Sequence, residues 1–184
     1  MTPHSLTDAD ASLTARLSRT LRPIPDYPKP GIVFQDITPV LRDGPLFRQV
    51  VEALAAPFRG PGVTHVVGIE ARGFILGGAV AATLGAGFVP VRKPGKLPWE
   101  RVTESYELEY GADALECHRD ALERGSRAVI VDDVLATGGT AAAAGRLARG
   151  LGAEVIGWSF LLEIAALEGR RRLAGAPSPA LLSV

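Results

Sequence analysis

One segment, residues 128–140, constrains the fold of this chain more than any other. An unbroken apolar run over residues 128–131 meets two adjacent carboxylates, Asp132 and Asp133, and a short turn then leads into Thr-Gly-Gly-Thr and an alanine-rich stretch. A continuous apolar run is typical of a parallel strand that is buried on both faces. The segment therefore predicts a buried strand, a loop and the start of a helix.

The same segment also indicates a ligand. Glycines let successive backbone N–H groups turn inward, and a helix N-terminus favours an anion such as a phosphate. Two carboxylates beside that anion would accept hydrogen bonds from sugar hydroxyls or face a divalent cation. A sugar phosphate satisfies both halves of the pattern. The alternative is an ordinary strand-to-helix turn whose acids face solvent. The sequence contains neither the P-loop pattern of nucleoside-triphosphate enzymes nor Gly-x-Gly-x-x-Gly.

Composition narrows the class of protein. The 184 residues suit one domain, and 20 basic residues balance 20 acidic residues, so we expect no nucleic-acid partner. Cys117 is the single cysteine, which excludes a disulfide framework within the chain and favours a reducing cytoplasm. We see no signal peptide and no apolar run of membrane-spanning length, so we expect no membrane partner.

Strand and helix patterns alternate along the chain, which predicts an α/β fold with a central parallel sheet flanked by helices. We expect the proline-rich residues 22–31 to form neither a helix nor a strand, and residues 93–107 to form a long loop. Helices are expected over residues 10–21, 45–58, 73–84, 111–122, 140–151 and 164–174. Strands are expected over residues 63–69, 88–91, 128–131 and 155–162, with an edge strand in the tail.

Two further segments carry cations near the expected strand ends. Arg72 follows the strand over residues 63–69 and precedes a helix, where its guanidinium could bind an oxyanion, although a surface turn is the simpler local interpretation. Residues 92–101 hold four cations, among them Lys93 and Lys96. A basic loop of this length could close over a phosphate site, or could be a solvated patch.

The acid pair followed by Thr-Gly-Gly-Thr resembles the phosphoribosyl-diphosphate signature of the type I phosphoribosyltransferases. The resemblance implies that Asp132 and Asp133 hold the ribose hydroxyls and that the segment around Arg72 binds pyrophosphate, often beside a cis peptide, here within residues 70–72. It implies a magnesium ion that is bound mainly through substrate oxygens, with no metal ligand assigned to the chain. The residues implied to hold the 5′-phosphate are Ala136, Thr137, Gly138, Gly139 and Thr140.

Three more segments are similar to the adenine-specific members of that family. Residues 92–98 resemble a loop in which cations, here Lys93 and Lys96, bind pyrophosphate, partly across a dimer interface. Residues 105–111 resemble the lid whose glutamate handles a proton on the purine ring, which points to Glu109, with Tyr110 beside it. Residues 22–41 resemble a hood that covers the base, and the residues implied to contact the base are Val33, Phe34 and Gln35. Many relatives carry arginine where this chain has Gln35.

The resemblance implies a purine-salvage enzyme in which adenine attacks 5-phosphoribosyl 1-diphosphate and gives AMP and pyrophosphate. Arg72 and Glu109 would act in catalysis, and the protein would be a homodimer. Two alternatives stay open: transfer to another purine base, and a regulator that senses phosphoribosyl diphosphate without catalysis. Regulators of that kind typically carry a DNA-binding domain, for which the chain has little spare length.

Overall fold

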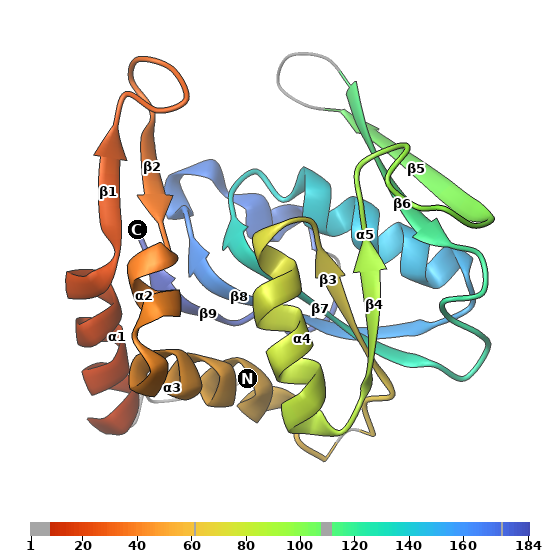
Figure 1. The fold of residues 1–184 in the computed structure, drawn as a ribbon, viewed down its shortest axis with the longest axis horizontal. Coiled ribbons are helices and arrows are strands. Elements are labelled where there is room, and N and C mark those ends of the chain that lie inside the picture. Colours follow the sequence, from red (N-terminus) through yellow and green to blue (C-terminus); the bar gives the residue numbers. More distant parts are fainter. Residues whose placement is uncertain (1–7, 61, 108–111, 174) are drawn as a thin grey trace. The chain divides into compact units, whose positions relative to one another are not determined.

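A topological switch point between two parallel strands organises the larger part of the molecule. The computed structural model describes residues 8–60, 62–107, 112–173 and 175–184. The chain divides into two compact units, Met1–Val50 and Val51–Val184. The second unit carries a five-stranded sheet in the order β4-β3-β7-β8-β9 (Figure 1). All four pairings in this sheet are parallel.

The strands and helices of this sheet follow the alternation that the sequence predicts. They are β3 (His65–Ile69), α4 (Arg72–Leu84), β4 (Gly87–Val91), β7 (Arg127–Leu135), α5 (Gly139–Gly150), β8 (Glu154–Glu163) and β9 (Ala180–Ser183). The crossovers that contain α4 and α5 leave the central strands β3 and β7 in opposite directions. Right-handed crossovers then put the two helices on opposite faces of the sheet. The predicted parallel sheet flanked by helices is confirmed, as is the edge strand in the tail.

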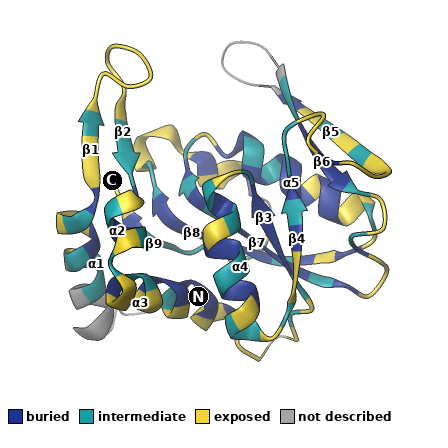
Figure 2. Cartoon of the chain, viewed as in Figure 1, coloured by how far each residue is buried: buried dark blue, intermediate teal, exposed yellow. Residues whose placement is uncertain are grey.

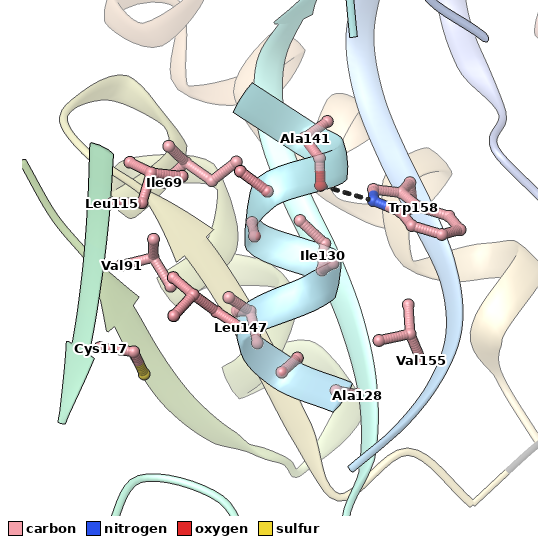
Figure 3. Close-up of a cluster of buried hydrophobic side chains, with 14 of the residues drawn as sticks. Ile69, Val91, Leu115, Cys117, Ala128, Ile130, Ala141, Leu147, Val155 and Trp158 are labelled. Carbon is pink, nitrogen blue, oxygen red and sulfur yellow. Dashed lines mark hydrogen bonds between the residues drawn. The ribbon is translucent and has the colours of Figure 1, made fainter. Parts of the chain in front are cut away.

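The core lies where α5 packs on the sheet. Trp158 of β8 is 1% exposed, and its indole N–H donates to the carbonyl oxygen of Ala141 at 3.2 Å (Figure 3). Ile130 of β7 and Leu147 of α5 belong to the same buried cluster. Gly145 leaves room for the indole, because a Cβ there would lie 3.0 Å from a ring carbon of Trp158. Burial of this apolar surface holds helix and strands together and explains the unbroken apolar run of the central strand (Figure 2).

An antiparallel hairpin, β5 (Arg101–Glu107) and β6 (Ala112–His118), corrects two predictions. The sequence predicts a helix over residues 111–122 and a loop over residues 93–107, but both segments contain strands. Alanine, leucine and glutamate favoured a helix by local propensity, whereas pairing with the β-branched and aromatic residues of β5 decides the structure. The hairpin joins the end of β4 through a backbone bridge between Arg92 and Glu116.

The predicted helix over residues 164–174 is also wrong. Its residues form two short 3₁₀ turns, η2 (Ala165–Leu167) and η3 (Gly169–Arg172). Glu168 lies between them in the left-handed region, with φ of 49°, which interrupts a continuous helix. A further 3₁₀ turn, η1 (Ala56–Phe58), ends the predicted helix over residues 45–58.

The first unit contains α1 (Asp8–Thr20), β1 (Arg22–Pro25), β2 (Val33–Asp36), α2 (Thr38–Arg42) and the start of α3 (Gly44–Ala55). Strands β1 and β2 pair antiparallel, so the prediction of no regular element over residues 22–31 is wrong for residues 22–25. A two-stranded ribbon tolerates its prolines because only alternate residues donate to the partner strand. The Arg22 guanidinium binds the Asp36 carboxylate at 2.6 Å and reinforces the pairing.

Candidate active site

A pocket of about 330 Å³ opens at the carboxyl ends of β3 and β7. In open α/β sheets this edge, at the switch point of the strand order, is where ligands bind. The end of β3 and the first turn of α4 form one wall, and the end of β7 with the loop into α5 forms the other. The lining residues are Ile69, Glu70, Ala71, Arg72, Lys93, Asp132, Asp133, Val134, Leu135, Ala136, Thr137, Gly138, Thr140 and Ala141.

The acid pair lies inside β7 rather than after it, because the strand continues to Leu135. Asp133 is 5% exposed, and its carboxylate forms an ion pair with Nε of Arg72. The backbone N–H of Asp133 donates to Oδ1 of Asp132 at 2.9 Å. The structure thus brings together the two predicted ribose-binding acids and the predicted pyrophosphate-binding arginine.

Asp132 occupies an unfavourable place for a negative charge. Burial raises its pKa well above the usual range, and the negative charge of Asp133 raises it further. The first turn of α4 lies against this carboxylate, since a Cβ on Gly73 would come within 2.7 Å of its Oδ1. Only glycine therefore fits at position 73.

Residues just after β4 bind the segment that precedes Arg72. The peptide bond between Glu70 and Ala71 is cis, within the predicted residues 70–72. The Glu70 carboxylate accepts from the Arg92 guanidinium at 3.1 and 3.2 Å and from the backbone N–H of Lys93 at 3.0 Å. Burial alone would raise the pKa of Glu70, but these donors and charges lower it below its usual value. An ionised Glu70 thus ties the start of the basic loop to the end of β3.

The predicted phosphate loop forms the other wall. Ala136, Thr137, Gly138 and Thr140 line the pocket, and Gly139 is the first residue of α5. Gly138 has φ of 80°, a conformation that favours glycine, and it precedes the helix without a side-chain cap. This arrangement turns the N-terminus of α5 toward the pocket, as anion binding requires.

Lys93 enters the pocket as part of a hydrogen-bonded network. Its ammonium donates to the Tyr106 hydroxyl at 3.0 Å and forms an ion pair with Asp113. The Tyr106 hydroxyl donates to the Asp113 carboxylate at 3.1 Å and accepts from the Thr140 hydroxyl at 3.2 Å. Burial would lower the pKa of Lys93, but the bonds to Asp113 and Tyr106 raise it above its usual value.

Sequence reasoning missed Tyr106 and Asp113 as members of the site. Tyr106 falls in the lid motif and could have been singled out there, but Asp113 falls in a segment expected to be helical. The buried Glu116 was missed for the same reason. Its carboxylate accepts from the backbone N–H of Gly95 at 2.9 Å and from Arg101 at 3.0 Å, which fixes the base of the basic loop.

Lys96 does not line this pocket. Its carbonyl oxygen accepts from the Arg92 guanidinium at 3.0 Å. Trp99 follows in the same loop and is 64% exposed. The side chain of Lys96 therefore keeps its pyrophosphate role only as a prediction.

Other predicted residues lie elsewhere. Glu109 and Tyr110, the predicted proton-transfer residue and its neighbour, lie outside the described residues. Val33, Phe34 and Gln35 form most of β2 in the first unit. Phe34 packs edge-on against Tyr27, with ring centroids 5.3 Å apart. Contact of these residues with a base stays a prediction.

Among the residues that the structure describes, no group of three or more histidine, cysteine, aspartate or glutamate side chains could hold a metal ion. No described helix is both long and apolar enough to cross a membrane.

Comparisons with known proteins agree with this geometry. Residues 41–172 match the model of the phosphoribosyl transferase domain. The adenine phosphoribosyltransferase of Myxococcus xanthus (strain DK1622) is 59% identical over 164 residues, which cover 89% of each chain. The crystal structure of adenine phosphoribosyltransferase from Rhodothermus marinus DSM 4252 superimposes with a TM-score of 0.91 at 53% identity, covering 95% of this chain and 99% of that one.

A third relative carries ligands. The adenine phosphoribosyltransferase of Saccharomyces cerevisiae, solved with D-2,5-dideoxy-2,5-imino-altritol 1,6-bisphosphate and adenine, has a TM-score of 0.87 at 42% identity and covers 93% of this chain and 99% of its own. The family model covers more than half of the chain, and these relatives align over most of it. The chain therefore belongs to the phosphoribosyltransferase family, among its adenine phosphoribosyltransferases.

Proposed function

We propose that the chain transfers the 5-phosphoribosyl group of 5-phosphoribosyl 1-diphosphate to adenine, giving AMP and pyrophosphate in purine salvage. One observation carries the proposal: the acid pair, Arg72 and the glycine-rich loop surround a single pocket in a chain that is 59% identical to an adenine phosphoribosyltransferase. Relatives crystallised with adenine and with 9-deazaadenine support the choice of base.

The sugar phosphate would use the two walls of the pocket. Backbone N–H groups of residues 136–140 and the N-terminus of α5 would bind the 5′-phosphate. Asp132 and Asp133 would accept hydrogen bonds from the ribose hydroxyls. Arg72, Lys93 and Lys96 would stabilise the pyrophosphate as it leaves. Positioning and electrostatics of this kind supply most of the help when a bond to a sugar carbon breaks through an oxocarbenium-like transition state.

The base would be held by Val33, Phe34 and Gln35, and Tyr110 would lie beside it. Glu109 would exchange a proton with the purine ring, because a carboxyl group in a closed, dry site has a raised pKa suited to that task. Backbone contacts to the adenine edge would make Gln35 an adequate substitute for the arginine of many relatives.

Magnesium fits this pocket as a substrate-bound ion. The two adjacent carboxylates supply the hard oxygen donors that the ion prefers, whereas the described residues provide no complete protein cage. When bound, the ion would offset charge on the diphosphate and ribose oxygens. Asp132 and Asp133 would then face it through the ribose or through water.

We further propose a cytoplasmic homodimer. The buried, free thiol of Cys117 suits a reducing compartment. Pyrophosphate binding across a dimer interface in similar enzymes supports the pairing of two chains. Sedimentation at about twice the chain mass of 19.3 kDa would support the dimer, and a single-chain mass would contradict it.

Formation of AMP from labelled adenine and 5-phosphoribosyl 1-diphosphate, with and without magnesium, tests the proposed activity. We expect AMP only when both substrates and magnesium are present. Parallel assays with hypoxanthine, guanine and xanthine decide between bases, and a strong preference for any of these would overturn the assignment. Tight binding of phosphoribosyl diphosphate without turnover of any base would instead identify a sensor.

A further inference from the structure

The loop proposed to bind the 5′-phosphate rests on the backbone of a distant glycine. A Cβ placed on Gly169 would overlap the carbonyl oxygen of Ala136 and would lie 2.8 Å from the amide nitrogen of Gly138 and 2.9 Å from the carbonyl carbon of Thr137. All three partners are backbone atoms of the predicted phosphate loop, residues 136–140, called the pocket loop below. The contact is reciprocal, because a Cβ on Gly138 would lie 2.9 Å from the carbonyl carbon of Gly169.

This contact differs in kind from an ordinary tight packing contact. Flexible side chains can move aside by a few tenths of an ångström, whereas here two backbone segments touch with no side chain between them. Gly169 is not among the glycines of the chain that have a positive φ, so its backbone conformation does not require glycine. Glycine is required there because the backbone of the pocket loop lies so close.

The 3₁₀ turn η3, which contains Gly169, is bound to the end of β8 and to Ser178. Gly169 begins η3, and the next residue, Arg170, forms a two-pronged ion pair with Glu163 at the end of β8. The same guanidinium donates to the backbone oxygen and to the hydroxyl of Ser178. Leu173, just after η3, belongs to the buried core. The turn is therefore tied to the sheet and cannot yield freely if the loop presses on it.

From this geometry we infer that Gly169 is a positioning residue for the phosphate loop, and that the Arg170–Glu163 pair holds Gly169 in place. The inference rests on the proposed function, because it assigns the loop to the 5′-phosphate. Any side chain at position 169 would displace residues 136–138 and with them the N–H groups that face the phosphate. A displacement of about 1 Å at such a site can cost up to a hundredfold.

Gly169→Ala, measured by steady-state kinetics with each substrate varied in turn, tests the inference. We expect the KM for 5-phosphoribosyl 1-diphosphate to rise by about tenfold or more, with the KM for adenine nearly unchanged. The dissociation constant of ribose 5-phosphate, measured by calorimetry, should rise by a similar factor. A purely structural defect would instead lower kcat through a smaller active fraction and leave both KM values unchanged.

Gly150→Ala is the matched control. Gly150 ends α5, the helix into which the loop leads, and a Cβ there meets nothing within 4 Å. We expect both KM values to stay at the wild-type level. Should Gly169→Ala fail to fold, Arg170→Ala decides, since it releases η3 without adding an atom beside the loop. It should raise the same KM and the same dissociation constant, by a smaller factor.

Unchanged values for phosphoribosyl diphosphate in Gly169→Ala, or in Arg170→Ala if only that variant folds, would overturn the inference. Failure of the proposed function has a different signature: the wild-type protein itself would form no AMP. In that case binding of ribose 5-phosphate to wild type and variant still tests the role of Gly169.

Discussion

Asp132 shows how a ligand site can lower the stability of the fold at a single side chain. Its pKa is raised in the folded protein by burial and by Asp133, so its ionisation near neutral pH works against folding. A ribose that donates hydrogen bonds to the carboxylate would offset that cost. At this residue, therefore, the demands of binding and of folding oppose each other.

Asp132→Asn should raise the free energy of unfolding at pH 7 by about 1 kcal/mol while lowering kcat/KM for 5-phosphoribosyl 1-diphosphate about tenfold or more. Asparagine keeps an oxygen that can accept from the N–H of Asp133 but carries no charge to desolvate. Denaturant unfolding and steady-state kinetics measure the two effects. A loss of both stability and activity would contradict the account of Asp132.

The sign of the pH dependence follows from the raised pKa. The folded protein keeps the Asp132 proton to higher pH than the unfolded chain does, because the pKa of this side chain is near 3.8 in the unfolded chain and is raised on folding. The contribution of this group to stability is thus full below that pH and is lost as pH rises through the folded pKa. The stability advantage of Asp132→Asn should grow as pH is raised from about 4, and melting curves over this range check it.

Asp133→Asn serves as the neighbouring comparison. Asp133 is buried and forms an ion pair with Arg72. Its replacement by asparagine therefore removes a stabilising ion pair, whereas the same change at Asp132 removes a charge that is costly to bury. We expect it to lower the free energy of unfolding by about 1 kcal/mol, opposite in sign to Asp132→Asn, while activity falls in both. Equal stability changes in the two variants would show that the environments of the two acids do not differ as described.

At the scale of elements, the β5–β6 hairpin connects parts of the pocket that the sequence presents as separate. The Tyr106 hydroxyl bonds to Lys93 of the basic loop and to Thr140 at the start of α5, and Asp113 completes the network. A single hydroxyl therefore couples the proposed pyrophosphate-binding and 5′-phosphate-binding elements.

Tyr106→Phe should lower the free energy of unfolding by about 1 kcal/mol, because it leaves the partly buried groups of Lys93, Asp113 and Thr140 without this hydroxyl. The KM for 5-phosphoribosyl 1-diphosphate should rise, with a smaller change for adenine. Tyr27→Phe controls for stability, since Tyr27 is exposed and should tolerate the loss of its hydroxyl. Wild-type behaviour of Tyr106→Phe in both assays would mean that the network has no role.

The same hairpin explains which elements can be predicted from sequence. The segment around Asp132 is predicted correctly because its apolar run, its acids and its glycines all favour a single arrangement. The residues around Asp113 instead have mixed local preferences, and their partners in β5 lie 5 to 17 positions away in the chain, so pairing overrides propensity. The contact between Gly138 and Gly169 is non-local as well, and no local pattern indicates it.

At the scale of the whole molecule, the predicted binding residues fall in both compact units. The phosphate-binding residues belong to Val51–Val184, whereas Val33, Phe34 and Gln35 belong to Met1–Val50. The sequence motifs predict this order along the chain, but motif order does not place the units in space. Kinetics can separate the roles of the two units, because each proposed substrate relies on different residues.

Phe34→Ala should raise the KM for adenine on the order of tenfold, since stacking of an aromatic ring on a base contributes about 1–3 kcal/mol. The KM for 5-phosphoribosyl 1-diphosphate should change little. Phe34→Tyr keeps the ring and should preserve the KM for adenine. If Phe34→Ala raises both KM values equally, the ring supports the fold of its unit rather than the base.

The two tryptophans of the chain lie in opposite surroundings. Trp158 is 1% exposed in the core, and Trp99 is 64% exposed in the basic loop. The ultraviolet emission of the protein should therefore contain a blue-shifted component that dissolved iodide cannot reach and a red-shifted component that it quenches. Trp99→Phe would leave only the first component, as a reporter of unfolding. In the wild type, protection from iodide would reveal, without any added label, when an arriving substrate covers the basic loop.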